Sequence, residues 1–260
     1  SKQINFFLAM KYIILSILIF ISKVISQSME NHFHTNLGDL YPDPMIAIKY
    51  QEDWQRDFYL KRIAQFKKKP IGFKKIVFLG NSITEGGDDW NKRFGVNNIV
   101  NRGISGDITE GILSRLDEII YYKPIAIFLL IGINDIFDNY PHKKNINSSQ
   151  VAKNIIQIAE NIYKYCRNTK IFIQTILPVD IQKHMDYNDR SLSSYNSEMV
   201  NQIIAINQLI KGQNNFPVID LYTAFVDERG LINETYTTDG VHLNDIGYKA
   251  WVEYVNKYAQ

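Results

Sequence analysis

The sequence predicts a doubly wound α/β fold, in which helices cover both faces of a parallel sheet. Short apolar runs that fit buried strands alternate with longer segments whose apolar residues recur at helical spacing. The chain has 260 residues, of which 45% are hydrophobic and 22% charged, so it is long and apolar enough for a sizeable core. In sheets of this class, ligands bind beyond the carboxyl ends of the strands.

The expected strands and helices alternate along the chain. Strands are expected at residues 75–80, 98–101, 125–132, 170–177 and 216–220. Helices are expected at residues 108–121, 148–165, 193–211 and 243–258. In the second of these helices, Val151, Ile155 and Ile158 share one face, as in an amphipathic helix. Apolar strands joined by helices indicate βαβ units, and therefore a parallel sheet.

The region before the first strand is expected to be an extension of the main domain. Residues 27–49 are rich in Asn, His, Gly, Asp and Pro, which is typical of a loop. A helix is expected from residue 50 to about 66, with Trp54, Phe58 and Ile63 on its apolar face. These boundaries divide the chain into residues 1–26, the extension 27–74 and the main domain 75–260.

The N-terminal residues fit a secretory signal peptide. Met10, the expected start, and Lys11 precede an apolar stretch at residues 12–21, and Gln27 follows the expected cleavage point. Ten apolar residues are too few to span a hydrocarbon core of ~30 Å as a helix. We therefore expect a signal peptide at about residues 10–26, an exported or periplasmic protein, and no stable membrane span after cleavage. An uncleaved anchor is the alternative.

Composition argues against several classes of ligand and partner. The single cysteine, Cys166, excludes an intramolecular disulfide. The net charge is only +2, and the one basic run, residues 67–69, is too short for a nucleic-acid surface. His32 and His34 lack an evident third ligand, and the chain has no Gly-x-Gly-x-x-Gly motif. We therefore expect no metal, no nucleotide cofactor and no nucleic-acid partner.

Polar residues follow the expected strands, and some of them fit nucleophilic catalysis. Ser82 follows the first strand, in "GNSIT" at residues 80–84. A serine nucleophile needs a base, an acid that orients the base, and donors for the oxyanion. Asp239 precedes His242 by three residues, whereas the other four histidines, His32, His34, His142 and His184, lie in loops without a carboxylate placed to orient them. Alone, the Asp239–His242 spacing fits a helix cap equally well.

Four segments in order resemble the blocks of the SGNH hydrolase superfamily, also called GDSL esterases: "GNSIT" (80–84), "NRGISGDIT" (101–109), "GIND" (132–135) and "DGVHLN" (239–244). The resemblance implies a flavodoxin-like three-layer α/β/α sandwich with a five-stranded parallel sheet. It also implies that Ser82 is the nucleophile, His242 the base and Asp239 the orienting acid. The implied oxyanion donors are the main-chain N–H groups of Ser82 and Gly106 and the side-chain amide of Asn134.

The chemistry of these residue types agrees with the roles that the resemblance implies. Gly106 has no Cβ, so its N–H can approach an oxyanion closely. Asn134 is a neutral donor that does not compete as a base. Asn81 stands where many members have Asp, but that Asp is not a triad member, so the assignment is unchanged. Asp135 is interpreted as a helix cap or acceptor, and Glu85 as an acid in the first turn of a helix.

The expected activity is hydrolysis of short-chain esters, with acetyl preferred, on a carbohydrate, through an acyl-enzyme intermediate. The loops at residues 86–97, 136–147 and 178–193 should form the walls of the site, with Trp90 and Phe137 contacting the substrate. Aromatic rings among hydrogen-bonding side chains suit a sugar. These loops contain no apolar run long enough to bind a long acyl chain, of which each buried methylene is worth ~0.8 kcal/mol. Alternatively, the two rings only pack their loops.

Two other functions remain open from the sequence. One is a lipid-directed acylhydrolase, such as a lysophospholipase or a thioesterase. The other is a sugar-binding relative without catalysis. It is the weaker alternative, because all the residues that catalysis needs are present. The acyl acceptor and the oligomeric state are left open.

Overall fold

The computed structural model describes residues 37–137, 146–188 and 198–259. Residues 41–260 form one compact unit. Residues 1–40 form another, in which Leu37–Leu40 make a short 3-10 helix, η1. The predicted signal peptide, together with His32 and His34, lies outside the described residues, so the export prediction stays a prediction.

Five strands form one parallel sheet in the order β2-β1-β3-β4-β5. The strands are β1 (Ile76–Gly80), β2 (Ile99–Gly103), β3 (Ala126–Leu130), β4 (Lys170–Gln174) and β5 (Val218–Ile219). This order is that of flavodoxin-like folds, so the predicted fold class is confirmed. All five expected strands are found, although β5 is shorter than the apolar run at residues 216–220.

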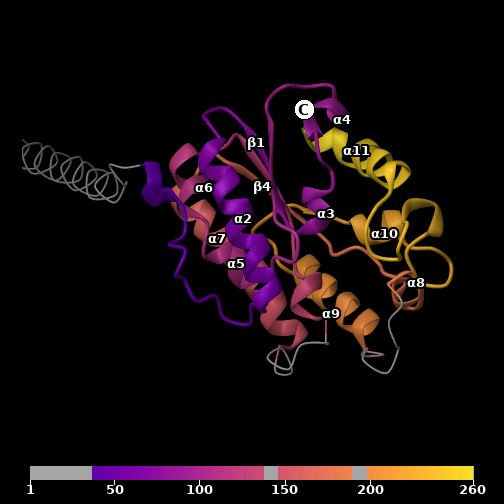
Figure 1. Cartoon of the computed structure of the whole chain (residues 1–260). Coiled ribbons are helices and arrows are strands. Elements are labelled where there is room, and N and C mark those ends of the chain that lie inside the picture. Colours follow the sequence, from indigo (N-terminus) through magenta and orange to yellow (C-terminus); the bar gives the residue numbers. More distant parts are fainter. Residues whose placement is uncertain (1–36, 138–145, 189–197, 260) are drawn as a thin grey trace, which may run out of the picture. The chain divides into compact units, whose positions relative to one another are not determined.

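Helices lie on both faces of the sheet and complete the predicted three layers. Figure 1 shows α2, α5, α6 and α7 on one face and α3, α4 and α11 on the other. Helix α9 packs against α7, and α10 packs against α11. The bounds are α2 (Asp53–Lys68), α3 (Ser82–Glu85), α4 (Trp90–Phe94), α5 (Thr109–Leu113), α6 (Asp117–Tyr122), α7 (Ser148–Tyr165), α8 (Ile181–Tyr187), α9 (Met199–Gly212), α10 (Leu221–Phe225) and α11 (Asp245–Ala259). The described part of residues 41–260 also includes the 3-10 helices η2 (Ile133–Asp135) and η5 (Glu234–Tyr236).

The segment at residues 108–121 was expected to form one continuous helix. This expectation was wrong, because the segment forms two helices, α5 and α6. The break is at residues 114–116, where Arg115 is buried. Its guanidinium donates to the carboxylate of Asp107 and to the main-chain oxygen of Gly80. A straight helix would not deliver this cation to both acceptors, and the apolar periodicity of the segment contains no signal for the break.

Helix α2, in the expected extension at residues 27–74, belongs to the same compact unit as the sheet. The Tyr59 hydroxyl donates to the main-chain oxygen of Gly111 at 3.1 Å. The helix buries a stripe of four residues: Gln55, Tyr59, Ile63 and Phe66. Trp54 and Phe58 lie outside this stripe and are 41% and 50% exposed, so the expectation that they share the core face of Ile63 was wrong.

Aromatic rings form the core on one side of the sheet. Phe78 on β1 stacks on Phe128 of β3, and Phe128 stacks on Phe172 of β4, with ring centroids 4.9 Å apart in both pairs. Trp90 of α4 stacks on Phe78 at 4.4 Å, and Trp251 of α11 meets Trp90 edge to face at 4.8 Å. Burial of such large rings stabilises the α4–α11 layer against the sheet.

Strand β2 forms one edge of the sheet, and β5 forms the other. The Ile99 main chain of β2 exchanges two hydrogen bonds with the side-chain amide of Asn91, at 2.8 and 2.9 Å. The Asn91 amide thus takes the place that the main chain of a further strand would occupy.

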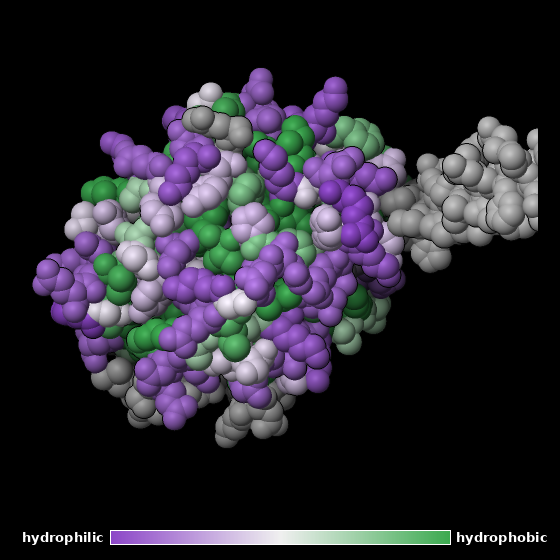
Figure 2. Space-filling view, turned by 180° about the vertical axis from the view of Figure 1, so that it is seen from behind, coloured by the Kyte–Doolittle hydropathy of each residue, from purple (hydrophilic) through white to green (hydrophobic). Residues whose placement is uncertain are grey.

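Hydrophilic residues cover most of the face shown in Figure 2, which lies behind that of Figure 1, and hydrophobic residues lie among them in small groups. Within the described ranges, no helix combines the length and the hydropathy needed to cross a bilayer.

Candidate active site

Ser82 lies at the carboxyl end of β1, an inner strand of the sheet, at the start of α3. Gly80 ends the strand, and a Cβ there would lie 2.2 Å from Oγ1 of Thr84 and 2.3 Å from the main-chain oxygen of Leu130, so this position accepts only glycine. Asn81 caps α3 through a 3.0 Å hydrogen bond from the N–H of Ile83. Because Asn81 supplies the cap, the hydroxyl of Ser82 is available for another role.

The Ser82 hydroxyl is hydrogen-bonded to a histidine that is in turn hydrogen-bonded to a carboxylate. Oγ of Ser82 lies 3.0 Å from Nε2 of His242, and Nδ1 of His242 lies 2.7 Å from Oδ2 of Asp239. A carboxylate on Nδ1 favours the tautomer with a proton on Nδ1, which leaves Nε2 as the acceptor for the serine proton. The predicted trio is therefore brought together with the geometry of a serine hydrolase.

A tight turn holds the Asp239 carboxylate beside His242. Its Oδ1 accepts the N–H groups of Val241 and His242 at 2.9 and 2.7 Å. Gly240, between them, has φ +85°, and a Cβ there would lie 2.2 Å from the main-chain oxygen of Asp180. The glycine in "DGVH" thus permits the backbone that turns both acceptor oxygens toward their donors.

Asp239 is held in its charged form. Burial acts to raise the pKa of its carboxyl, but the nearby imidazoles of His184 and His242 outweigh burial and hold the pKa well below its ordinary value. The His242 side chain is 44% exposed and the Asp239 side chain only 11% exposed. Asp239 is thus shielded from solvent, while His242 faces the pocket.

Gly106 and Asn134, the expected oxyanion donors, line the same pocket as Ser82 and His242. Gly106 has φ +78°, in the region that favours glycine. Asn134 is in η2, just beyond β3, and its Nδ2 donates to the main-chain oxygen of Asp107 at 2.9 Å. This bond ties the loop that carries Gly106 to the end of β3.

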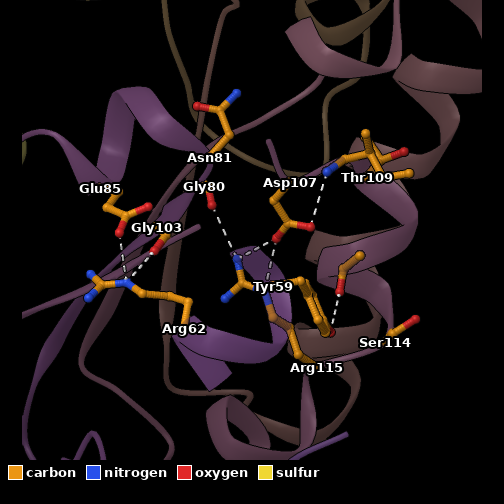
Figure 3. Close-up of polar contacts among 12 residues, drawn as sticks. Tyr59, Arg62, Gly80, Asn81, Glu85, Gly103, Asp107, Thr109, Ser114 and Arg115 are labelled. Atoms are coloured by element: carbon orange, nitrogen blue, oxygen red, sulfur yellow. Dashed lines mark hydrogen bonds and ion pairs between the residues drawn. The ribbon is translucent and has the colours of Figure 1, made fainter. Parts of the chain in front are cut away.

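A buried ion pair holds the Gly106 loop to the end of β1. Nη2 of Arg115 lies 2.8 Å from Oδ2 of Asp107 and 3.2 Å from the main-chain oxygen of Gly80, as Figure 3 shows. Burial raises the pKa of Asp107 to about 6, although the Arg115 guanidinium opposes the shift. Both side chains are almost fully buried, so the pair is shielded from solvent.

Glu85 holds the other side of the same loop. Its Oε2 accepts the N–H of Ser105 at 2.6 Å and the Ser105 hydroxyl at 2.7 Å. Nε of Arg62 lies 3.2 Å from Oε1 of Glu85 and donates to the main-chain oxygen of Gly103 at 3.0 Å (Figure 3). Glu85 belongs to the helix that begins with Ser82, so one carboxylate connects the serine helix to the Gly106 loop.

Asp135 acts as an acceptor, which confirms its interpretation as a structural acid. Its Oδ1 accepts the Thr109 hydroxyl at 2.5 Å, and both carboxylate oxygens accept the Thr109 N–H at 3.1 Å. This contact fixes the start of α5, directly after the Gly106 loop.

The pocket beside Ser82 has a volume of about 570 Å³. Its aromatic lining comes from Phe137, as expected, and from Trp54 and Phe58 of α2, which the sequence analysis did not place there. Trp90, the other expected substrate contact, is only 1% exposed and packs between Phe78 and Trp251. The expectation that Trp90 contacts the substrate was therefore wrong, because α4 turns the indole into the core. Part of the expected loop walls, at residues 138–145 and 189–193, lies outside the described residues.

His184 is a site residue that the sequence analysis missed. It lines the pocket, and its Nδ1 lies 3.2 Å from the main-chain oxygen and 3.6 Å from Oδ2 of Asp239. Its ring centroid lies 6.4 Å from that of His242. The sequence separation of 55 residues from Asp239 hid this contact; the position of His184 after β4, at the carboxyl edge of the sheet, was the available signal.

Comparison with known proteins assigns the chain to a family. The model of the GDSL-like lipase/acylhydrolase family matches residues 78–250. The chain belongs to this family. The match confirms the SGNH resemblance and an activity as a carboxylic ester hydrolase. It begins at Phe78, so α2 with Trp54 and Phe58 precedes the matched range.

Individual relatives of this GDSL-family chain are distant. Platelet-activating factor acetylhydrolase IB subunit alpha1 of Rattus norvegicus is 23% identical over 212 residues, which cover 80% of this chain and 82% of the rat protein. A GDSL-like lipase of Bacteroides thetaiotaomicron superposes with a TM-score of 0.63 at 23% identity, covering 77% of this chain and 96% of the lipase. The acetyl xylan esterase AlAXEase gives 0.55 at 21% identity, covering 72% and 100%. At such identities the two structures show the shared fold.

Proposed function

We propose that this GDSL-family hydrolase is an exported serine esterase that removes short acyl groups, acetyl above all, from carbohydrate. Ser82 is the nucleophile, His242 the base and Asp239 the orienting acid. The observation that carries the proposal is the chain of contacts from Oγ of Ser82 to His242 at 3.0 Å and from His242 to Asp239 at 2.7 Å, beside Gly106 and Asn134.

In the first half of the reaction, Oγ of Ser82 attacks the ester carbonyl carbon while Nε2 of His242 takes the hydroxyl proton. The carbonyl oxygen becomes an oxyanion, which accepts hydrogen bonds from the N–H groups of Ser82 and Gly106 and from the amide of Asn134. When the intermediate collapses, the ester C–O bond breaks and His242 returns the proton to the leaving alcohol oxygen. The acyl group remains on Ser82.

In the second half, water attacks the acyl-Ser82 carbonyl carbon and gives a proton to Nε2 of His242. The same donors bind the second oxyanion. Collapse breaks the bond to Oγ of Ser82, which takes the proton from His242, and the carboxylic acid leaves. Asp239 stays charged throughout, and this role fits its lowered pKa.

Two features support a short acyl group on a polar acceptor. The pocket combines aromatic rings with the polar residues Gln55, Ser105 and His184. The rat relative is named an acetylhydrolase, and the solved neighbour AlAXEase is an acetyl xylan esterase. Both names refer to acetyl esters, and the second to a carbohydrate acceptor.

A lipid-directed acylhydrolase is the second candidate. The exposed rings of Trp54 and Phe58 favour it, because an acyl chain gains ~0.8 kcal/mol for each methylene that it buries against such rings. The rat relative also acts, by its name, on platelet-activating factor.

Rates on a panel of acetyl, butyryl and octanoyl esters of one alcohol, and on acetylated xylan, separate the two candidates. We expect the rate to drop steeply from acetyl to octanoyl and to vanish in Ser82→Ala, whose far-UV spectrum should match the wild type. Preference for octanoyl esters would establish the lipid-directed function instead. Wild-type turnover by Ser82→Ala would exclude Ser82 as the nucleophile.

Export is tested separately, in the native host. The basic start and the apolar residues 12–21 support cleavage before Gln27. N-terminal sequencing of the secreted protein should then begin near Gln27. A recovered protein that still contains Lys11 would show that the segment is an anchor.

A further inference from the structure

The first turns of α2 form one wall of the pocket. Trp54 and Phe58 are four residues apart, so they lie on one face of the helix, and their rings meet edge to face with centroids 6.2 Å apart. Both line the pocket beside Ser82. Both residues precede the range that the family model matches, residues 78–250.

These two rings are placed for a ligand rather than for the core. Trp54 is 41% exposed and Phe58 50% exposed, whereas α2 buries Tyr59, Ile63 and Phe66. The indole lies against the oxyanion loop, since a Cβ on Gly106 would be 2.7 Å from Cζ3 of Trp54. Neighbouring exposed aromatic side chains inside a pocket are typical of a binding surface.

An acetyl group is too small to cover both rings, whose centroids are 6.2 Å apart, so most of this wall is left for the acceptor. An acetyl group adds a single methyl beyond the carbonyl carbon, which must lie next to Oγ of Ser82 during attack. The pocket has about 570 Å³, most of which an acetyl group leaves open. The half-exposed position of both rings also suits a part of the substrate that continues out of the pocket.

The chemistry of the wall favours a sugar ring. The faces of aromatic rings carry a partial negative charge, and the C–H groups on one face of a pyranose are positively polarised, so the two pack together. Gln55, between the rings in sequence, also lines the pocket and is 1% exposed. Its Oε1 accepts the N–H of Glu52, while its Nε2 has no partner among the residues that the structure describes. A buried amide donor of this kind suits a hydroxyl acceptor on a ligand.

We propose that Trp54 and Phe58, together with the Gln55 amide, form the subsite that binds the sugar ring of the acyl acceptor. This inference rests on the proposed function, because it assumes a short acyl group. It makes these α2 residues determinants of acceptor specificity, while the catalytic groups come from the family-matched range.

The test compares two acetyl esters that share the acyl group and differ in the acceptor. Methyl acetate carries a minimal acceptor, and acetylated xylotriose a sugar acceptor. We expect Trp54→Ala and Phe58→Ala each to lower the ratio of kcat/KM for acetylated xylotriose to that for methyl acetate by about tenfold, mainly through KM. Trp54→Phe should recover part of the loss. Phe73→Ala is the matched control, because Phe73 is 65% exposed and packs on Tyr121 and Tyr122, which are not among the residues lining the pocket.

A direct binding measurement complements the kinetics. Of the three tryptophans, Trp90 and Trp251 are buried, so a sugar that reaches a tryptophan meets Trp54. In Ser82→Ala, which retains the substrate, acetylated xylotriose should change the tryptophan fluorescence, and Ser82→Ala/Trp54→Phe should lose this change. An unchanged kcat/KM ratio in both alanine variants, or an equal fluorescence change with and without Trp54, would overturn the subsite.

Failure of the subsite and failure of the proposed function give different results. If wild type hydrolyses both acetyl esters but the ratio does not move, the subsite alone is wrong. If wild type prefers octanoyl esters, or if Ser82→Ala is active, the proposed function itself is wrong.

Discussion

The proposed oxyanion side of the pocket is held by charged side chains from several elements, whereas the Asp239 carboxylate is held mostly by main-chain N–H groups of its own turn. On the first side, Arg115 pairs with Asp107, and Glu85 binds Ser105. On the second, Asp239 accepts the N–H groups of its near neighbours Val241 and His242. Oxyanion donors must stay fixed during the reaction, while the base must serve both Ser82 and the leaving oxygen, so the two sides have different requirements.

The two buried carboxylates show the same contrast. Burial raises the pKa of Asp107 to about 6, against the opposing effect of Arg115. Asp239 is also buried, but the adjacent imidazoles hold its pKa well below the ordinary value. Burial thus dominates the pKa of Asp107, whereas the neighbouring imidazoles dominate that of Asp239. The following predictions test this division, from the largest expected effect to the smallest.

The largest effect is expected from Asp239→Asn. The amide can offer an N–H to His242 and so favour the wrong tautomer, which should lower kcat by ~10⁴-fold. The melting temperature near pH 7 should also fall, because the charged Asp239 carboxylate stabilises the fold at that pH, and far-UV circular dichroism should show that the variant is folded. Asp245→Asn is the control, since the side chain of Asp245 is 95% exposed. More than a tenth of wild-type activity in Asp239→Asn would show that the turn does not orient the base.

Arg115→Met should mainly affect stability. The variant leaves the Asp107 carboxylate buried without its cation, which typically costs ~3–5 kcal/mol of unfolding free energy. The double variant Asp107→Leu/Arg115→Met removes both charges and should recover most of this loss in denaturant titrations. Equal unfolding free energies of the single and double variants would show that the loss in Arg115→Met does not come from the unpaired charge of Asp107.

Glu85→Ala should lower kcat by about 30- to 100-fold with little change in KM, because the Gly106 N–H is no longer held in place. Glu85→Gln keeps one acceptor oxygen for Ser105 and should lose much less. Steady-state kinetics on one acetyl ester measure both. If the variants changed KM rather than kcat, or if both lost the same activity, Glu85 would not act by holding the Gly106 loop.

The opposite pKa shifts predict opposite pH dependences of stability. Asp107 has a folded pKa of about 6, above the unfolded value near ~3.9, so its stabilising contribution is complete below about pH 4 and is lost as pH rises to 6. For Asp239 the folded pKa is lowered, so its contribution is present above pH ~4 and is lost as pH falls further. Melting temperatures between pH 2 and 8, taken relative to Asp107→Asn and Asp239→Asn, should show slopes of opposite sign. Slopes of equal sign would show that the pKa values of Asp107 and Asp239 are not shifted in opposite directions.

The smallest effect is expected from His184→Phe. The variant removes the Nδ1 contact with Asp239 but leaves the 2.7 Å bond from His242, so kcat/KM should fall only about threefold. His184→Gln keeps a side-chain N–H and should fall less. A 100-fold loss of kcat/KM would show that His184 is essential for the reaction.

The sequence predicts the fold well because strands and helices follow local patterns, and the four segments that resemble the SGNH blocks name the side chains that the structure brings together. Apolar runs mark β1 to β4, and "DGVH" places Asp239 and His242 on one turn. The break between α5 and α6 could not be predicted, because it depends on where the buried Arg115 finds acceptors on other elements.

The pocket walls were predicted less well, because they depend on which face of an element is buried. Trp90 and Trp54 are both aromatic residues near the N-terminal end of a helix, yet one packs in the core and the other lines the pocket. Helical spacing places Trp54 and Phe58 one residue away from the buried stripe of α2, and only the sheet decides which stripe it covers.

The Asn91 side chain of α4, which is hydrogen-bonded to strand β2, affects how the protein behaves at high concentration. An open strand edge is a template on which a second chain can add and start ordered aggregation. At Ile99 the amide of Asn91 already occupies that template with two hydrogen bonds, 2.8 and 2.9 Å long. The Asn91 side chain thus blocks the addition of a further strand at Ile99. Its removal, as in Asn91→Ala, should cause turbidity on storage before it changes turnover.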